Sequence, residues 1–279
     1  MKQNAIWVSA YIYSDPPHEE LLVDGVLPSV KKVMDAGLAN RYFFIRYFDR
    51  GHHIRLRFEV EKKNEETVRD IINERVGEYF VAHPKKREME KDEYLPHQSI
   101  QYIPYEPEVA RYGGEQRIKI AEEQFMYSSE AVLSFLSVRD NWQYERRLGF
   151  ALQLAVIQLY AFGYREDSIK AYVKRILSLQ LKASKVITMS MLSSQLRKQP
   201  ELKDVGRSIY HSVKLHVEKK DNGLEYVMYM RKICMQLVKC KTEDSLLESL
   251  LSSYIHMTNN RLGIKNTDEI YLYYLLCDK

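Results

Sequence analysis

The spacing of apolar and polar positions changes character along the 279-residue chain. In the first hundred or so residues, short runs rich in β-branched and aromatic residues alternate with turn residues, whereas later segments repeat apolar residues at helical spacing. The strands expected in the first part are residues 5–13, 41–48, 52–61 and 98–105, with helices at 19–36 and 65–80. The helices expected in the second part are 115–138, 144–162, 166–181, 204–218, 223–240, 243–262 and 267–276.

These elements predict an α+β fold. A small mixed or antiparallel sheet with flanking helices is expected in residues 1–113, followed by a mostly helical part in residues 114–279, together forming a single domain. Residues 82–97 are charged and lack an apolar face, so we expect an exposed loop there. Residues 184–204 are weakly patterned, which favours a second loop that could close over a site.

Charge and composition exclude several classes of function. A net charge of +4 from 42 Lys+Arg and 38 Asp+Glu is too small to indicate direct binding of nucleic acid. The longest mostly apolar stretch, residues 150–162, is shorter than the roughly 20 residues that a membrane crossing needs, so we expect a buried helix and no membrane partner. The N-terminus shows no signal-peptide cleavage site, which predicts a cytoplasmic location. Cys234, Cys240 and Cys277 include no C-x-x-C pair, which argues against a disulfide framework and a structural zinc site.

The densest candidate chemistry lies in residues 42–60, where two strand-like runs flank Asp49-Arg50-Gly51, a sequence suited to a hairpin turn. The two-residue period of a strand separates two faces: Ile54, Leu56, Phe58 and Val60 on one, and His53, Arg55, Arg57 and Glu59 on the other. Two arginines about 7 Å apart on one face could bind a carboxylate. The alternative is a solvated face whose arginines pair with acidic side chains.

A glycine pair precedes the first long helix. Arg111 and Tyr112 are followed by Gly113 and Gly114, so backbone amides at the helix start could face an anion. The alternative is an ordinary glycine turn with a surface arginine.

The helix expected at residues 243–262 carries an unusual polar stripe. Its core side should be formed by Leu247, Leu250, Leu251, Tyr254 and Ile255. The neighbouring stripe is polar but uncharged: Ser249, Ser252, Ser253, His256, Asn259 and Asn260. Such a stripe suggests contact with other protein or with a polar pocket, where His256 could transfer a proton near neutral pH. The alternative is a structural histidine with satisfied hydrogen bonds.

Motifs for nucleotides and metals are absent from the sequence. There is no G-x-x-x-x-G-K loop, no G-x-G-x-x-G after a strand, no G-x-S-x-G turn and no H-E-x-x-H helix. His52 and His53 are adjacent on a strand and therefore point to opposite faces, which does not suit one metal ion. We expect neither a cofactor nor a metal.

Five motifs follow one another over essentially the whole chain: W-V-S-A-Y-I-Y, Y-F-F-I-R-Y, H-I-R-L-R-F, E-V-A-R-Y-G-G and I-H-M-T-N-N-R-L. This ordered set resembles the C-terminal glutamate-elimination domain of class I lantibiotic dehydratases and the stand-alone thiopeptide-type bacteriocin biosynthesis proteins. The resemblance implies a catalytic set of Arg55, Arg57, Arg111 and His256. We also expect substrate to be bound by Arg46, His53, Tyr112 and Asn260.

The resemblance also implies an activity. In that family, the full-length enzyme transfers glutamate from charged tRNA onto Ser or Thr of a precursor peptide, and the C-terminal domain expels the glutamate to leave dehydroalanine or dehydrobutyrine. The expected partners are therefore a precursor peptide, leader and core, and a separate glutamyl-tRNA-dependent glutamylating protein. Arg55 and Arg57 would hold the leaving glutamate, Arg111 would stabilise developing charge, and His256 would transfer the proton.

Two other functions stay open for the same resemblance. Thiopeptide pyridine synthases are similar to the elimination domain, but they join two dehydroalanines by a formal aza-[4+2] cycloaddition and release the leader peptide. A non-catalytic scaffold that binds the precursor along a sheet edge is the third reading. A homodimer formed through residues 270–276 is a further expectation, with packing of that helix inside the chain as the alternative.

Overall fold

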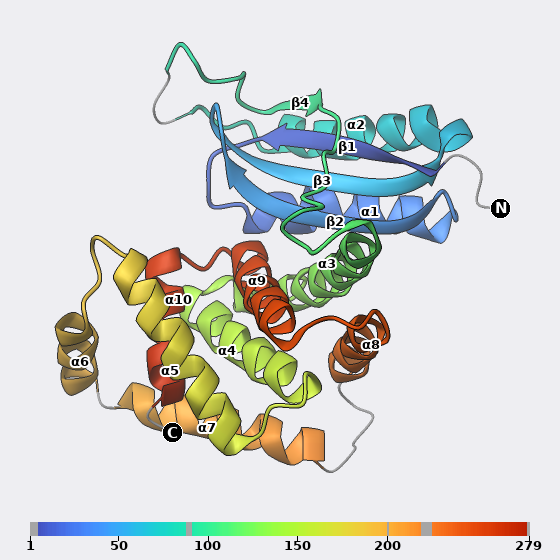
Figure 1. Ribbon diagram of the computed structural model, residues 1–279. Coiled ribbons are helices and arrows are strands. Elements are labelled where there is room, and N and C mark those ends of the chain that lie inside the picture. The colour runs from blue at the N-terminus through green and yellow to red at the C-terminus, as the bar shows by residue number, and fades with distance from the viewer. Residues whose placement is uncertain (1–4, 88–90, 200, 219–224, 278–279) are drawn as a thin grey trace. The chain divides into compact units, whose positions relative to one another are not determined.

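The computed structural model describes residues 5–87, 91–199, 201–218 and 225–277, which form two compact units. The first unit comprises the described residues up to Arg111 together with Phe125–Trp142. The second comprises Tyr112–Gln124 and the described residues from Gln143 onward. The sheet of the first unit and the helices of the second are labelled in Figure 1. That residues 1–279 act as one elimination-domain-like unit stays a prediction.

The first unit is built on a four-stranded antiparallel sheet with strand order β2-β3-β1-β4. Its elements are β1 (Ala5–Tyr13), η1 (Leu21–Val26), α1 (Leu27–Asp35), β2 (Ala39–Phe48), β3 (His52–Glu61), η2 (Lys62–Asn64), α2 (Glu65–Ala82) and β4 (Ser99–Tyr102). It also includes the C-terminal half of α3 (Glu115–Leu136) and η3 (Arg139–Trp142). The α+β expectation is confirmed, and the sheet is antiparallel rather than mixed.

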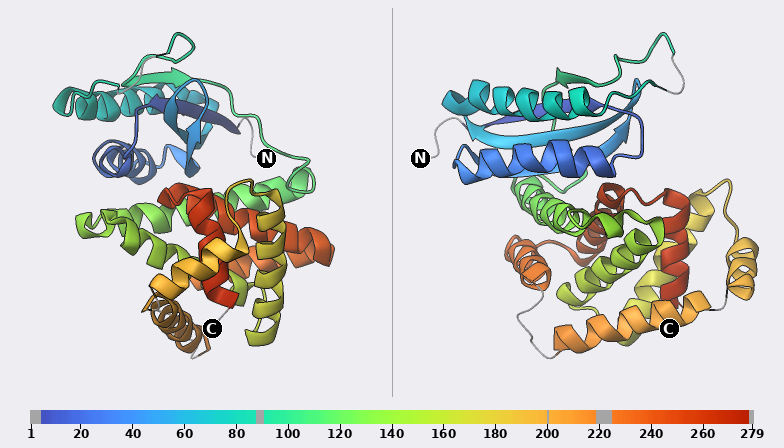
Figure 2. Two further views of the ribbon diagram at one scale, coloured as in Figure 1. Left: turned by 90° about the vertical axis from the view of Figure 1, so that its left-hand side faces the viewer. Right: turned by 180° about the vertical axis from the view of Figure 1, so that it is seen from behind.

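The two faces of β3 differ as the strand period predicts. Ile54, Leu56, Phe58 and Val60 are completely buried. Figure 2 shows α1 and α2 on the same side of the sheet, and both contribute buried valines such as Val33 and Val68. These side chains form the core of the first unit, so the opposite face of β3 carries the charged residues.

Local chemistry explains the ends and irregularities of these elements. The helix expected at 19–36 contains a π-helical segment, η1, which ends two residues before Pro28; proline lacks the N–H that a regular turn would use. The expected hairpin forms at Asp49-Arg50-Gly51, where Arg50 and Gly51 have φ of 52° and 112°. β4 ends at Tyr102, before the expected end, because Pro104 cannot donate a ladder hydrogen bond.

Hydrogen bonding at the outer strand β2 includes one side chain from a helix. The Phe44 backbone N–H donates to the Ser129 hydroxyl of α3 at 3.2 Å. Ser129 is fully buried, so this bond occupies a main-chain donor that faces outward from the sheet.

Every regular element described in the second unit is a helix. It contains the N-terminal half of α3 with α4 (Tyr144–Ala161), α5 (Glu166–Ala183), α6 (Met189–Lys198), α7 (Glu201–Glu218), α8 (Glu225–Lys239), α9 (Asp244–Leu262) and α10 (Asn266–Cys277). The helix expected to begin at 223 is described from Glu225; residues 223 and 224 lie outside the described residues. α4 packs against α7, α8 and α9, and α10 packs against α5.

Burial in this unit bears on the expectations for α4 and α10. α4 is buried over almost its whole C-terminal half, which confirms the buried helix expected at residues 150–162. Within the described residues, no helix has the length and apolar content needed to cross a membrane. Ile270, Tyr273 and Leu276 of α10 are buried, which favours packing of that helix inside the chain over a dimer contact. Cys234, Cys240 and Cys277 are each half-buried.

The loop expected at residues 184–204 was wrong for two parts, residues 189–198 and residues 201–204, the second of which is the first turn of α7. Residues Met189–Lys198 form α6. The Thr188 hydroxyl accepts a hydrogen bond from the Met191 N–H at 3.3 Å, and Leu192 and Leu196 are buried one helical turn apart. This short helix is stabilised by one N-cap and by the packing of two leucines within the unit. The weak local sequence pattern did not indicate that packing.

Candidate active site

Strand β3 holds the expected anion-binding arginines between neighbouring strands that are rich in aromatic residues. In the antiparallel register, Arg55 lies opposite Tyr11 of β1, and Arg57 lies opposite Phe43 of β2. His53 lies two residues before Arg55 on the same face. We call the sheet surface that carries His53, Arg55 and Arg57 the arginine face.

The Arg55 guanidinium lies between two tyrosine rings and is oriented by a histidine. Its central carbon is 3.5 Å from the Tyr47 ring centroid and 4.4 Å from that of Tyr11. Its Nε donates to Nε2 of His53 at 3.1 Å, and His53 Nδ1 lies 2.9 Å from the Gly51 carbonyl oxygen. Because Nε2 accepts, the imidazole proton is on Nδ1 and is donated to Gly51. Burial lowers the pKa of His53 to about 4, so the ring is neutral near pH 7.

Arg57 is the more deeply buried of the two arginines. Its side chain is largely enclosed, with the residue only 7% exposed. The guanidinium carbon lies 4.4 Å from the Tyr105 ring centroid and 5.3 Å from that of Phe43. Burial lowers the pKa of this guanidinium, and its Nε has no hydrogen-bond partner among the described residues. The cation is therefore surrounded largely by aromatic rings, and the Tyr11 side chain hydrogen-bonds to it.

Counter-charge is distributed unevenly over this face of the sheet. Arg41 binds Glu59 through two hydrogen bonds of 2.6 and 3.0 Å. Within the described ranges, no carboxylate lies within ion-pair distance of Arg55 or Arg57. The alternative interpretation, in which the arginines of this face pair with acidic side chains, therefore does not apply to Arg55 and Arg57. A buried charge without a partner costs several kcal/mol, which the aromatic rings offset in part and a bound anion would offset further.

Arg46, expected to bind substrate, lies on the opposite face of the sheet. Its register partner is Ile54, whose side chain belongs to the core under α1 and α2. Its Nη2 donates to Glu19 Oε1 at 3.0 Å in a largely buried ion pair. Because neighbouring residues on a strand point to opposite faces, the structure does not bring Arg46 together with Arg55 and Arg57. We leave it out of the candidate site.

Arg111 is exposed and pairs with Glu108 across one turn, at 2.9 Å. The glycines that follow it have positive φ, 79° at Gly113 and 107° at Gly114. A Cβ on Gly113 would lie 2.7 Å from Leu246 Cδ2, so this glycine allows a close approach of the chain to α9.

The rest of this turn is fixed by an arginine and a tyrosine. Arg117 donates to the Gly113 carbonyl and to Thr242, both at 2.9 Å. The buried Tyr112 makes a 3.0 Å hydroxyl contact with Ser253 of α9. These contacts give Tyr112 an anchoring role in the second unit, beside the substrate-binding role expected for it.

His256 is placed by a carboxylate from the next helix. Its Nδ1 lies 3.0 Å from Glu269 Oε2, and its side chain is 39% exposed while that of Glu269 is 3% exposed. The chain reverses between α9 and α10 at Gly263, which has the left-handed φ of 74° and ends α9. Asn260 lies one turn after His256 on α9 and is half-buried, so the two share the polar stripe expected there.

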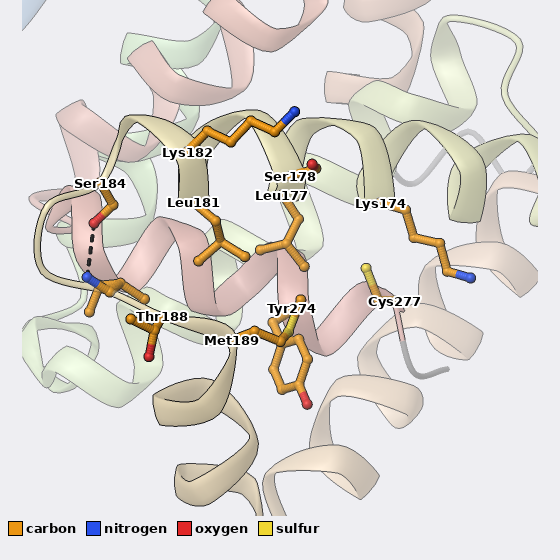
Figure 3. Close-up of a pocket in the computed structure, with 11 residues that line it drawn as sticks. Lys174, Leu177, Ser178, Leu181, Lys182, Ser184, Thr188, Met189, Tyr274 and Cys277 are labelled. Atoms are coloured by element: carbon orange, nitrogen blue, oxygen red, sulfur yellow. Dashed lines mark hydrogen bonds between the residues drawn. The ribbon is translucent and has the colours of Figure 1, made fainter.

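A cavity of about 640 Å³ lies elsewhere in the second unit, bounded by α5, α10 and the start of α6 (Figure 3). Leu177, Leu181, Met189 and Tyr274 give it an apolar lining, with Lys174 and Lys182 beside them. It contains none of the residues expected to carry chemistry. Among the residues that the structure describes, no group of three His, Cys, Asp or Glu side chains is placed to hold a metal ion.

Comparison with known proteins identifies the family. A family model described as the C-terminal part of lantibiotic biosynthesis dehydratases matches residues 7–279. The chain belongs to this family. As a lantibiotic dehydratase C-terminal domain, it is 23% identical over 280 residues to the nisin biosynthesis protein NisB of Lactococcus lactis subsp. lactis. That match covers 97% of this chain and 25% of NisB, so the chain spans about a quarter of the length of that relative.

Solved structures share the fold of this dehydratase C-terminal domain. The pyridine synthase TbtD from thiomuracin biosynthesis has a TM-score of 0.75 at 18% identity, with 98% of this chain and 97% of that chain covered. The tRNA-dependent lantibiotic dehydratase MibB from Microbispora sp. 107891 has a TM-score of 0.70 at 20% identity, covering 100% of this chain and 28% of that chain. At these identities, the likeness shows a common fold.

Sequence reasoning missed two features of this dehydratase C-terminal domain. The rings beside Arg57 come from Phe43 of β2 and from Tyr105 in the segment after β4, and neither was predicted to lie there. Glu269 was also missed, because an acidic residue in the first turn of a helix is an ordinary feature. Pairing the predicted strands in register could have placed aromatic rings beside the arginines. No sequence pattern indicated that Glu269 would contact His256.

Proposed function

We propose that this chain eliminates glutamate from glutamylated Ser and Thr residues of a precursor peptide, which leaves dehydroalanine and dehydrobutyrine. The observation that carries the proposal is the pair of arginines on the arginine face, Arg55 and Arg57, which have aromatic neighbours and no carboxylate partner within the described residues. Family membership over residues 7–279 supports the same reaction class.

The leaving group matches these arginines. Glutamate carries carboxylates before and after the ester bond breaks, and a guanidinium binds a carboxylate through two parallel hydrogen bonds. Arg57 is buried, so the attraction to an anion is stronger there than at the surface. We assign Arg55 and Arg57 to binding of the departing glutamate. His53 orients the Arg55 side chain through its hydrogen bond.

The remaining steps need a base and a stabiliser of negative charge. β-Elimination removes the α-proton, forms the Cα–Cβ double bond and expels the carboxylate from Cβ. His256 is assigned to the proton transfer. Arg111 is assigned to stabilising the negative charge that develops on the neighbouring carbonyl oxygen. Tyr112 and Asn260 are assigned to binding of the peptide.

The partners follow from this reaction. The substrate already carries glutamate, so the chain requires a separate glutamyl-tRNA-dependent protein that glutamylates the precursor, and the precursor supplies both leader and core. The reaction consumes an activated ester made in the cytoplasm, where we place this chain. A homodimer is not required by any of the assigned roles.

A second candidate is pyridine synthesis, by formal cycloaddition of two dehydroalanines with release of the leader peptide. It is favoured by the match to the pyridine synthase TbtD, of which 97% is covered at a TM-score of 0.75. Elimination is preferred because cycloaddition expels no glutamate and gives no role to two anion-binding arginines.

Mass spectrometry separates these functions. The protein is incubated with a glutamylated precursor and, separately, with a fully dehydrated one. We expect one glutamate to be lost per modified site from the first peptide. A change in the second peptide alone, with leader release, would replace elimination by pyridine synthesis. Binding of both peptides without any mass change would leave a precursor-binding scaffold.

A further inference from the structure

Three polar side chains from three helices, Gln180, Glu269 and His256, are joined in series by hydrogen bonds. Gln180 of α5 donates from Nε2 to Glu269 Oε1 at 3.2 Å. The other carboxylate oxygen of Glu269, on α10, lies 3.0 Å from Nδ1 of His256 on α9. The carboxylate is thus held on both oxygens, and one of its two partners is the residue proposed to move a proton.

The burial and charge around Glu269 favour a particular state of this histidine. Glu269 is 2% exposed, and no lysine or arginine lies within ion-pair distance of it among the described residues. An ionised carboxylate in such a place accepts hydrogen bonds only. His256 must therefore carry its proton on Nδ1, which leaves the lone pair on Nε2, the nitrogen directed away from the carboxylate.

We propose that Glu269 is a positioning residue that sets the tautomer and direction of His256 for proton abstraction, with Gln180 holding Glu269 in turn. This inference rests on the elimination reaction proposed above. In that reaction the α-proton moves to Nε2 of His256, and the electron pair of the Cα–H bond forms the double bond. The Cβ–O bond breaks, and glutamate leaves as a carboxylate. Glu269 stays ionised and stabilises the imidazolium that forms beside it.

A purely structural role would be different in its consequences. If Glu269 only joins α10 to α5 and α9, its loss would lower stability and leave the chemistry of the folded protein intact. If it positions His256, an isosteric neutral replacement would lower the rate of the chemical step more than substrate binding.

The variants are Glu269→Gln and Glu269→Asp, with Asp268→Asn as the matched control. Asp268 is the preceding residue on α10, and its carboxylate binds the Tyr144 hydroxyl, away from His256. Single-turnover elimination and KM are measured on each folded variant with a glutamylated precursor. We expect Glu269→Gln to lower the elimination rate by about 100-fold or more with KM nearly unchanged. Glu269→Asp should recover part of this loss, and Asp268→Asn should react at the wild-type rate.

A second measurement does not depend on activity. Nitrogen NMR of the histidine-labelled wild-type protein reports the tautomer, and the His256 signal is assigned by its disappearance in His256→Gln. The proposal expects the Nδ1–H form for the neutral ring. An Nε2–H form would overturn the proposal, as would an unchanged elimination rate in folded Glu269→Gln.

Failure of this inference can be told apart from failure of the proposed function. An inactive His256→Gln combined with a fully active Glu269→Gln removes only Glu269 from the mechanism. Full activity of His256→Gln removes the histidine as the base. A wild-type protein that leaves the glutamylated precursor intact removes the elimination reaction itself, while the NMR tautomer still tests the placement of His256.

Discussion

Replacing Arg57 by methionine is expected to raise the free energy of unfolding of the first unit and to abolish glutamate elimination. Arg57 is 7% exposed, has no carboxylate partner among the described residues, and has a pKa lowered by burial, so the folded state disfavours its charge. Methionine keeps an unbranched apolar stem and can make sulfur–aromatic contacts with the same rings.

The expected change in the free energy of unfolding is the difference between two opposing contributions. Burying the guanidinium costs several kcal/mol. The Tyr105 and Phe43 rings, at 4.4 and 5.3 Å, recover about 1 to 2 kcal/mol each at this degree of burial. Removing the charge should therefore stabilise the fold by about 1 to 3 kcal/mol, within the range of about 1 to 4 kcal/mol seen when buried ion pairs are replaced by apolar groups.

Arg41→Met provides the matched control on the same face of the sheet. Arg41 has the bidentate partner Glu59, whose side chain is 16% exposed. Removing one member of a partly buried pair leaves the other without its counter-charge, so this variant should lose about 1 to 2 kcal/mol. The two substitutions therefore have opposite expected signs.

The assay is urea unfolding followed by tryptophan fluorescence. Both tryptophans, Trp7 and Trp142, lie in the first unit, so the signal follows that unit. Free L-glutamate should raise the unfolding midpoint of the wild type and not that of Arg57→Met, because a ligand stabilises only the state that binds it. A loss of stability in Arg57→Met as large as that in Arg41→Met would refute the reasoning and make Arg57 a structural residue.

Two further predictions concern pH and the glycine turn. Burial lowers the pKa of His18 to about 3 and of His53 to about 4, below the ordinary value of 6.5. From pH 6.5 down toward 4 the unfolded chain therefore binds more protons, and the first unit should lose up to about 2.7 kcal/mol per pH unit. His53→Gln should halve that slope in urea unfolding, and an unchanged slope would contradict the burial argument. Gly113→Ala should destabilise the second unit by about 1 to 3 kcal/mol more than Gly114→Ala in circular-dichroism melts. Both glycines have positive φ, but only the Gly113 Cβ would meet Leu246, at 2.7 Å, so equal losses would argue against that contact.

Much of the fold could be predicted because its signals are local. The two-residue period assigned Arg55 and Leu56 to opposite faces of β3, and the Asp49-Arg50-Gly51 sequence located the hairpin. The long amphipathic helices of the second unit were also recognisable, since each repeats apolar residues over several turns.

The features that sequence reasoning missed depend on contacts between distant segments. α6 is short, and its two buried leucines become informative only when their packing is known. The strand period assigned faces only within β3, so Arg46 of β2 was expected to bind substrate. The register that puts Arg46 opposite Ile54, and its pairing with Glu19, were not predicted. Glu269 is 13 residues from His256, and the reversal of the chain at Gly263 brings them together.

The hydrogen bond between Phe44 and Ser129 has a consequence for association between copies of the chain. Outer strands of a sheet are templates on which another molecule can add a strand, and proteins protect them by covering or shortening them. Here a hydroxyl from α3 occupies a main-chain donor of β2 at 3.2 Å, and β4 offers only Ser99–Tyr102 before Pro104. Both outer strands are therefore interrupted as templates for domain swapping or fibril growth, β2 at Phe44 and β4 by its short length. For the same reason, a precursor peptide should be held by side chains rather than by an added strand.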